Sequence, residues 1–392
     1  MYIDVFTSNG TDAAQLTSKF SEWLEAQSTA PSFLALHQSV PSLSSQLGDL
    51  VDDACALHGA TSCLGVMGVD GPKIESGAGA FAIWDTDGSY GTALAAFSDD
   101  PRRAAREATQ NALAAADRSG EAPDLIWISS SPGQEEALLE GVLDIVGSNV
   151  PVLGGSAADD TVSGDWVVFD HGEAIGNGVI VSVLFPSRPI SFAYHNGYAP
   201  TLRSGSVTAV EGRLLKEIDN RPAAEVYREW VGEGVIPEKV ASQTAILSES
   251  TLSPLGRYLE SVSDVPYYLL AHPAGLTPND ELELFANVDV GDTLTLMTGS
   301  PAQLTQRAGK VASLAAQAGE FVPDDIAGAL MIYCGGCMLA VQEQLDDVAA
   351  GVREALPGVP FLGVFTFGEQ GVVLDGRNRH GNLMISAIVF GA

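Results

Sequence analysis

Hydrophobic residues along this chain follow two alternating spacings. Short apolar runs, such as "SFLALHQS" (32–39) and "DLIWISSS" (124–131), predict strands. Longer stretches with an apolar residue every three to four positions, such as 42–59 and 134–148, predict helices. Because strands and helices alternate along the chain, the pattern predicts an α/β fold.

Two of the predicted helices begin with recognisable capping residues. Asp100 precedes Pro101, and Ser300 precedes Pro301. The side-chain oxygen of Asp or Ser can accept a free N–H group at a helix start, and proline fits the first helical position because it needs no donor there. Helices are therefore expected to begin at Pro101 and Pro301.

The pattern repeats with an offset of about 200 residues, in the same order. "ALMIYCGG" corresponds to "DLIWISSS", "VPFLGVFTFGE" to "VPVLGGSAADD", and "GNLMISAIVF" to "GNGVIVSVLF". We predict two pseudo-repeated α/β halves with mixed, largely helix-covered sheets, divided into residues 1–195 and 196–392. The general likeness of all α/β proteins is the alternative explanation.

Two further segments carry local predictions. Residues 198–235 match neither half and predict a hairpin followed by a helix around residues 222–232. The apolar runs "DWVVFDHGE" and "GNGVIVSVLF" predict a second hairpin.

Composition narrows the classes of partner. The 392 residues include 19 basic and 50 acidic residues, a net charge of −31. Such an acidic protein repels nucleic-acid phosphates and anionic lipids, so we expect neither as a partner. No signal peptide and no membrane-spanning apolar run is visible, and four cysteines argue against a disulfide scaffold. The chain is expected to be cytoplasmic.

Small and polar residues gather where four predicted strands end. These stretches are Ser129–Ser131, Gly154–Asp160, Cys334–Cys337 and Gly368–Glu369. Ligands of α/β proteins bind beyond the carboxyl ends of strands. If the halves pack by pseudo-symmetry, these stretches line one shared site.

"GGSAADD" is the first candidate. Gly154 and Gly155 allow close backbone approach, so nearby N–H groups could bind an anion, and Ser156 adds a hydroxyl group. Asp159 and Asp160 could bind an ammonium group or a metal. Neither a Walker P-loop nor a G-x-G-x-x-G motif is present. A tight turn with two solvated acids is the plain alternative.

"CGGC" is the second candidate. A C-x-x-C pair at a helix start is typical of thiol–disulfide chemistry, and it could also be half of a zinc site. Thioredoxin-type surroundings and a second C-x-x-C are both missing. We therefore expect Cys334 and Gly335 to form a close-packed pocket wall.

"RNRHGN" (377–382) is the third candidate, placed across a predicted hairpin from Glu369. Glu369, His380 and Asn382 at one site could bind a zwitterionic molecule. Glu369 and His380 could instead act as acid and base, or His380 could bind a metal or haem iron. A hairpin turn with a satisfied histidine is the alternative.

Several of these stretches resemble a known family. "VPVLGGSAADD" and "VFDHGEAIGNGVIVSVLF" resemble the FIST (F-box and intracellular signal transduction) N-terminal domain. "ALMIYCGGC", "VPFLGVFTFGEQG" and "RHGNLMISAIVF" resemble the FIST C-terminal domain. The resemblance implies sensing of small ligands, amino acids among them. One branch binds haem to sense nitric oxide and works with histidine kinases or cyclic-di-GMP enzymes, and here His380 would be the iron ligand.

The sequence therefore predicts a cytoplasmic sensor that binds a small ligand and signals through a separate partner, such as a histidine kinase. A homodimer is one form that it could take. The alternatives are a haem-based nitric oxide sensor, an enzyme with Glu369 and His380 as an acid–base pair, and an interaction scaffold. The expected ligand-binding residues are Gly154, Gly155, Ser156, Asp159, Cys334, Gly335, Glu369, His380 and Asn382.

Overall fold

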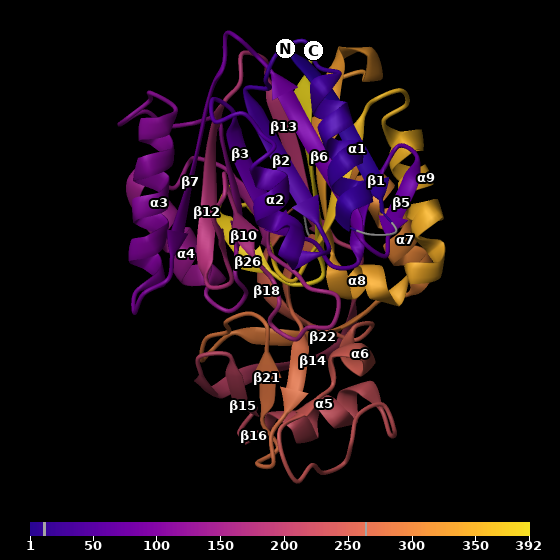
Figure 1. Cartoon of the computed structure of the whole chain (residues 1–392). Coiled ribbons are helices and arrows are strands. Elements are labelled where there is room, and N and C mark those ends of the chain that lie inside the picture. The colour runs from indigo at the N-terminus through magenta and orange to yellow at the C-terminus, as the bar shows by residue number, and fades with distance from the viewer. Residues whose placement is uncertain (11–12, 263–264) are drawn as a thin grey trace.

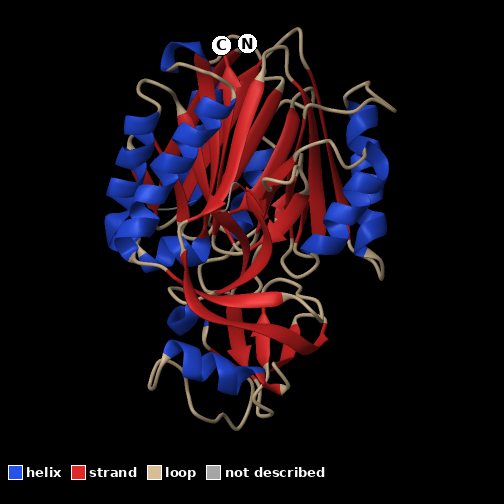
Figure 2. Cartoon of the chain, turned by 180° about the vertical axis from the view of Figure 1, so that it is seen from behind, coloured by secondary structure: helices blue, strands red, loops and turns tan. Residues whose placement is uncertain are grey.

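The computed structural model describes residues 1–10, 13–262 and 265–392. Three six-stranded mixed sheets form a large body, and a nine-stranded sheet forms a smaller body at one end (Figure 1). Helices cover the outer faces of the large body, so the strands lie inside (Figure 2). The predicted α/β class with mixed, helix-covered sheets is confirmed.

The first sheet is built mainly from residues 2–84, the first unit. Strands β2 and β3 are parallel, and β6 lies antiparallel to β2 on its other side. Strand β1 then pairs with β6 and ends the sheet. The elements are β1 (Tyr2–Asn9), α1 (Ala13–Glu25), β2 (Phe33–Gln38), η1 (Pro41–Leu43), α2 (Ser44–Gly48), β3 (Ala56–Thr61), β4 (Gly65–Gly68), β5 (Gly71–Ile74) and β6 (Gly77–Trp84).

The second unit, residues 89–185, has the same order of strands. Strands β8 and β9 are parallel, β12 lies antiparallel to β8, and β7 pairs with β12. The elements are β7 (Ser89–Ala96), α3 (Pro101–Ala115), β8 (Leu125–Ser130), α4 (Glu135–Val146), β9 (Val152–Ser156), β10 (Val168–Phe169), β11 (Ala174–Ile175) and β12 (Gly178–Phe185).

The third unit comprises residues 190–196 and 301–391 and repeats the order again. Strands β23 and β24 are parallel, and β27 lies between β23 and β13. The elements are β13 (Ile190–Asn196), α7 (Pro301–Ala318), η2 (Pro323–Asp325), β23 (Ile326–Cys334), α8 (Gly335–Ala340), η3 (Gln342–Gln344), α9 (Leu345–Ala355), β24 (Phe361–Thr366), β25 (Glu369–Val372), β26 (Asn378–Gly381) and β27 (Met384–Gly391).

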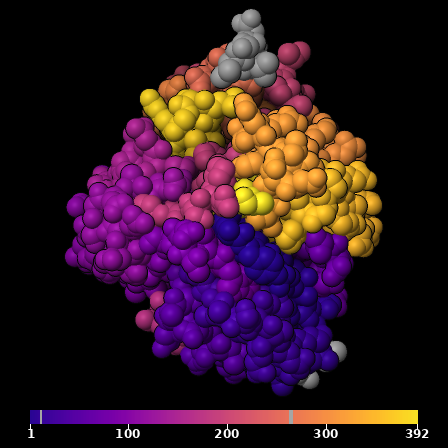
Figure 3. All heavy atoms as spheres, turned by 90° about the horizontal axis from the view of Figure 1, so that it is seen from above, coloured from indigo at the N-terminus to yellow at the C-terminus, as the bar shows by residue number. Residues whose placement is uncertain are grey.

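The repeat predicted from the sequence is thus confirmed in the second and third units, and the first unit adds a third copy. Seen from above, the three units occupy three sectors around a centre (Figure 3). Phe33, Trp127, Leu330 and Phe390 are buried there in one apolar core shared by all three units.

Each unit completes the sheet of another unit. The hairpin β4–β5 of the first unit pairs with β24 of the third. The hairpin β10–β11 of the second pairs with β3 of the first, and β25–β26 of the third pairs with β9 of the second. The three hairpins are therefore exchanged in a ring.

Residues 199–298, which we call the insert, interrupt the third unit between β13 and α7. The predicted hairpin and following helix are confirmed as β14, β15 and α5, and the insert has its own apolar core. The elements are β14 (Ala199–Glu211), β15 (Leu214–Ile218), β16 (Arg221–Pro222), α5 (Ala223–Val231), β17 (Thr244–Ala245), α6 (Leu247–Ser250), β18 (Leu255–Val262), β19 (Val265–Ala271), β20 (Pro273–Leu276), β21 (Leu282–Leu284) and β22 (Thr293–Thr298). The division at residues 195 and 196 remains a prediction.

The two capping predictions are confirmed. The Asp100 side chain accepts the N–H of Arg103 at 3.1 Å, and Ser300 accepts the N–H of Gln303 at 3.3 Å. Helices α3 and α7 begin at Pro101 and Pro301, as proline at the first position predicts.

Two local predictions are wrong. The helix predicted over 42–59 ends at Gly48, because Asp52 makes a turn in which its carboxylate accepts the Ala54 N–H at 2.9 Å. The apolar residues that follow form β3 instead. The runs at 165–173 and 176–185 do not pair with each other, since β10 joins β3 of the first unit while β12 lies between β7 and β8.

Candidate functional site

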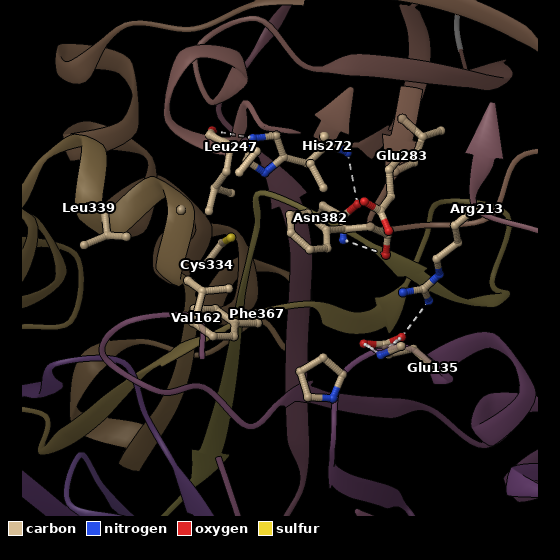
Figure 4. Close-up of a pocket in the computed structure, with 18 of the residues that line it drawn as sticks. Glu135, Val162, Arg213, Leu247, His272, Glu283, Cys334, Leu339, Phe367 and Asn382 are labelled. Carbon is tan, nitrogen blue, oxygen red and sulfur yellow. Dashed lines mark hydrogen bonds and ion pairs between the residues drawn. The ribbon is translucent and has the colours of Figure 1, made fainter. Parts of the chain in front are cut away.

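A cavity of about 670 Å³ lies between the insert and the carboxyl ends of β8 and β23 (Figure 4). We call it the pocket. The second and third units form one side, and the insert forms the other. Its lining residues are Pro132, Gly133, Glu135, Thr161, Val162, Trp166, Arg213, Gln243, Ala245, Leu247, His272, Ala274, Gly275, Glu283, Leu284, Phe285, Cys334, Gly336, Leu339, Phe367 and Asn382.

An ion pair crosses the pocket from the insert to the second unit. Arg213 Nη2 lies 2.6 Å from Glu135 Oε2 (Figure 4) and 2.7 Å from Glu136 Oε2. Glu136 also accepts the backbone N–H of Asn287 at 2.8 Å. The Glu135 side chain is only 2% exposed, so removal of Arg213 would leave a buried carboxylate without its cation.

Glu135 is held by donors on several sides. The N–H of Gly133 donates to both carboxylate oxygens at 3.0 Å, and the Ser156 hydroxyl donates to Oε1 at 2.7 Å. Burial alone would raise the pKa of Glu135, but nearby His380, Arg213 and Ser156 outweigh it and lower the pKa to about 2. Glu135 is therefore a fixed negative charge at neutral pH.

Gly368 allows the groups around Glu135 to approach one another. A Cβ atom at Gly368 would lie 2.6 Å from His380 Cε1 and 3.4 Å from Glu135 Oε1 and Ser156 Oγ. The close approach leaves no room for a side chain. The structure thus brings Ser156 and His380 close to Glu135: Ser156 donates a hydrogen bond to its carboxylate, and His380 lowers its pKa.

His272 is the histidine of the pocket lining. Its Nε2 lies 3.1 Å from the Leu247 carbonyl oxygen, and its backbone N–H donates to Asn382 Oδ1 at 3.1 Å. Burial lowers the pKa of His272 to about 4, so the ring is neutral at pH 7. Because a carbonyl only accepts, Nε2 carries the proton, and Nδ1 keeps a lone pair to which no described residue donates a hydrogen bond.

The wall near Cys334 is mainly apolar. Val162, Leu247, Leu339 and Phe367 lie around the Cys334 thiol (Figure 4). Burial raises the pKa of Cys334 well above its ordinary value, so the thiol is protonated and is no ready nucleophile.

The loop after β9 brings Val162 to this wall. The Asp159 carboxylate accepts the backbone N–H groups of residues 161 and 163–165 at 2.7–3.2 Å. Burial would raise the pKa of Asp159, but these four donors outweigh it and lower the pKa. Val162 has a φ of 54°, an unfavourable conformation for a β-branched residue. Asp159 therefore organises a strained loop and does not itself line the pocket.

The predicted site residues are only partly brought together. Cys334 and Asn382 line the pocket, while Ser156 and His380 lie behind Glu135. His380 Nε2 faces the Phe285 carbonyl oxygen at 3.2 Å, so His380 and Asn382 also anchor the insert.

The three glycines and Glu369 lie inside the protein. A Cβ atom at Gly154 would be 1.9 Å from the Ile128 carbonyl oxygen, at Gly155 2.5 Å from Thr366, and at Gly335 3.1 Å from the Thr366 carbonyl oxygen. Gly154 and Gly155 therefore permit close packing of strands, and Gly335 permits close approach of the start of α8 to the end of β24.

Glu369 and His380 do not face each other. His380 pairs across the hairpin with Gln370, and its Nδ1 lies 3.4 Å from Gln370 Nε2. Neighbouring strand residues point to opposite faces, so the Glu369 side chain points to the other side, where it accepts from Thr366 and from the Met384 N–H. Burial raises the pKa of Glu369 well above its ordinary range.

The sequence reasoning missed Glu135, Arg213, His272 and Glu283. Three of them belong to the insert, whose docking has no local sequence signal. The acidic pair at the start of α4 was visible, but acidic residues are common in a first helical turn. Within the described ranges, no group of three or more His, Cys, Asp or Glu residues is arranged to hold a metal ion. No described helix has both the length and the apolarity to cross a membrane.

Comparisons with known proteins identify the relatives of this chain. Residues 32–221 match the FIST N domain, and residues 223–372 match the FIST C domain. Uncharacterized protein MJ1623 of Methanocaldococcus jannaschii is 31% identical over 94 residues, which cover 24% of this chain and 18% of that protein. The aligned part is thus less than a fifth of that relative.

Two solved structures resemble the whole chain weakly. One is titled "Cyanuric acid hydrolase: evolutionary innovation by structural concatenation", with 10% identity and a TM-score of 0.38 over 100% of this chain and 99% of that chain. The other is the cyanuric acid hydrolase from A. caulinodans, with 9% identity, a TM-score of 0.38 and the same coverage. Likenesses this low do not bear on the activity of this chain. Since the two domain models together span most of the sequence, this chain belongs to the FIST domain proteins.

Proposed function

We propose that this protein is a sensor that binds a small molecule in the pocket and passes the event to a separate signalling protein, such as a histidine kinase. The observation that carries the proposal is the two-sided construction of the pocket. Ten of its 21 lining residues belong to the insert, and the others belong to the second and third units. A molecule bound there contacts both bodies at once.

The polar links between the two bodies at the pocket allow a local shift in position on binding. The chain enters the insert after Asn196 and leaves it before Ser300. At the pocket the links are polar: Arg213 to Glu135 and Glu136, and His380 to the Phe285 carbonyl. Beside it, Leu269, Leu270 and Met297 of the insert pack into the core of the third unit. A ligand that binds one orientation of the insert better than another shifts the population toward it, and a partner can detect that shift.

A haem-based nitric oxide sensor would need an open imidazole nitrogen at His380. Both of its ring nitrogens face protein groups, Gln370 Nε2 at 3.4 Å and the Phe285 carbonyl oxygen at 3.2 Å. The surroundings of His380 therefore do not fit a haem ligand. A Soret band in the purified protein that disappears in His380→Ala would overturn this reasoning.

An acid–base enzyme built on Glu369 and His380 is not favoured either. The two side chains lie on opposite faces of the β25–β26 hairpin, and neither lines the pocket. General acid–base catalysis needs both groups within reach of one substrate.

Thermal-shift screening against cationic, neutral and anionic metabolites tests the sensor proposal. A ligand at one hundred times its Kd stabilises the folded protein by about 2.7 kcal/mol, which gives a measurable rise in Tm. A broad panel that yields no stabilising compound of any charge would refute the proposal.

A matched pair of variants locates the binding site. Leu339 lines the pocket and is 42% exposed, while Leu314 on α7 is 41% exposed and lies outside it. Leu339→Trp should fill the pocket and abolish the ligand-induced rise in Tm, whereas Leu314→Trp should retain it. Equal retention in both variants would place the ligand elsewhere.

A further inference from the structure

We propose that the pocket selects a small organic cation, an amine attached to an apolar body, and discriminates against carboxylates. This inference rests on the proposed function, because it names the class of ligand for the same site. It follows from the charges that line the pocket and from an acceptor on His272, in the pocket lining, to which no described residue donates a hydrogen bond.

The carboxylates around the pocket outnumber the cationic side chains. Glu135 and Glu283 line the pocket together with a single guanidinium group, that of Arg213, which also pairs with Glu136 beside the pocket. Among the described lining residues, Arg213 is the only arginine, and lysine is absent. The side-chain charges therefore sum to a negative value before any ligand enters.

Arg213 is poorly suited to bind an added anion. Its Nη2 already donates to both Glu135 and Glu136, at 2.6 and 2.7 Å. A ligand carboxylate placed against the same guanidinium would be the third anion around one cation, and repulsion between like charges in a partly buried site is strong. The ion pair thus disfavours acids instead of attracting them.

Glu283 has no cationic partner among the residues that the structure describes. Its Oε2 accepts from Gln243 Nε2, and no ion pair to its carboxylate is formed. Glu283 lines the pocket on the insert side, opposite Cys334 (Figure 4). An ammonium group beside Glu283 would supply the missing counter-charge.

His272 adds an acceptor and no positive charge. With Nε2–H directed at the Leu247 carbonyl, its Nδ1 lone pair can accept an N–H of the ligand. Nδ1 accepts no hydrogen bond from a described residue, and His272 lines the pocket, so this lone pair is open to a donor of the ligand. Glu283 lacks a cationic partner, and Nδ1 of His272 lacks a hydrogen-bond donor among the described residues, so a ligand with a positively charged N–H donor group suits both.

The remaining wall fits an apolar body. Leu247, Leu339 and Val162 supply aliphatic surface, and Trp166 and Phe367 supply two aromatic rings, which lie edge to face with centroids 6.2 Å apart. Aromatic faces also attract cations. The net charge of −31 further raises the local concentration of cations near the protein.

The test compares ligands of equal shape and different charge. 2-Phenylethylamine, 2-phenylethanol and 3-phenylpropanoate, with the corresponding butyl and hexyl sets, are titrated by calorimetry and thermal shift. We expect the amine of each set to bind at least tenfold more tightly than its alcohol, and the carboxylate not to bind. Raising NaCl from 0.05 to 0.5 M should weaken only the amine, since salt screens the attraction.

A pair of neighbouring glutamates supplies the matched control. Glu283→Gln should weaken amine binding at least fivefold, whereas Glu281→Gln makes the same charge change outside the pocket and should leave it unchanged. Equal effects of the two substitutions would overturn the assignment of Glu283.

The outcomes separate this inference from the proposed function. If an alcohol or carboxylate binds as tightly as its amine and Leu339→Trp abolishes that binding, the amine class is wrong and the sensor stands. If no compound of any charge binds, both fall.

Discussion

His37 gives the sharpest prediction, because it lies in the central core without a hydrogen-bond partner on either ring nitrogen. Its ring centroid is 6.5 Å from that of His58 and 6.3 Å from that of Trp127. His58, in contrast, is held by Ser182 and Ser129 at 2.8 and 3.0 Å. Burial lowers the pKa of His37 to about 3, so the folded protein keeps this ring neutral.

The sign of the pH effect follows from proton linkage. An unfolded histidine has a pKa of about 6.5, so the unfolded chain takes up a proton below that pH while folded His37 does not. The contribution of His37 to stability is therefore fully present above pH 6.5 and is lost as pH falls toward 3. Between pH 7 and pH 5 the loss amounts to about 2 kcal/mol.

Substitution of His37 by leucine should remove this loss. His37→Leu also removes two buried nitrogens without partners, each of which costs about 1–3 kcal/mol in free energy of unfolding. We therefore expect the variant to be more stable than the wild type at pH 7. Its advantage should grow by about 2 kcal/mol at pH 5.

Urea unfolding at pH 5, 6 and 7 measures these differences. Leu36→Ala on the same strand is the control, since Leu36 is fully buried and does not titrate. It should cost about 2–5 kcal/mol at every pH. If the His37→Leu and wild-type stabilities fall in parallel between pH 7 and pH 5, the argument from a buried neutral imidazole is refuted.

Three further substitutions test the pocket. Arg213→Met should lower the free energy of unfolding by about 3–5 kcal/mol and speed proteolysis of the insert, because a buried carboxylate loses its cation. Lys216→Met, at an exposed ion pair, should change proteolysis little. Equal proteolysis rates of the two variants would contradict the ion-pair argument. Gly368→Ala should cost about 1–3 kcal/mol in urea unfolding, whereas Gly176→Ala, with its nearest neighbour at 3.5 Å, should cost less than that. Val162→Gly should relieve a strained φ of 54° and raise Tm while it weakens binding of 2-phenylethylamine; a lower Tm would refute the strain argument.

Local signals in the sequence predicted much of the fold. Asp100 and Ser300 act within one helical turn, so their capping roles could be derived from neighbouring residues alone. The β25–β26 hairpin could also be predicted, because its two strands are close together in the sequence. The sequence did not predict the first unit as a copy of the repeat, because α2 is short and the residues of β3 were assigned to the expected helix.

Pairing between distant segments could not be predicted in this way. Strand β10 carries a pattern that suits either β12 or β3, and only the assembled units decide between them. The site has the same limit. Arg213 and Glu135 are 78 residues apart in sequence and meet only because the insert docks on the second unit. Cys334 and Asn382 could be predicted as pocket residues from the sequence, because both lie next to the ends of predicted strands.

Each unit gives one hairpin to a neighbouring unit and receives one from the other, so the exchange of hairpins is a closed ring. The two termini lie side by side (Figure 1), and the Ala392 N–H donates to the Asp325 carbonyl at 2.8 Å. A circular permutant that joins them and opens the chain between β12 and β13 would keep all three exchanges. Separately produced fragments cut at that point would each expose unpaired strand edges and should recover their fold only on mixing.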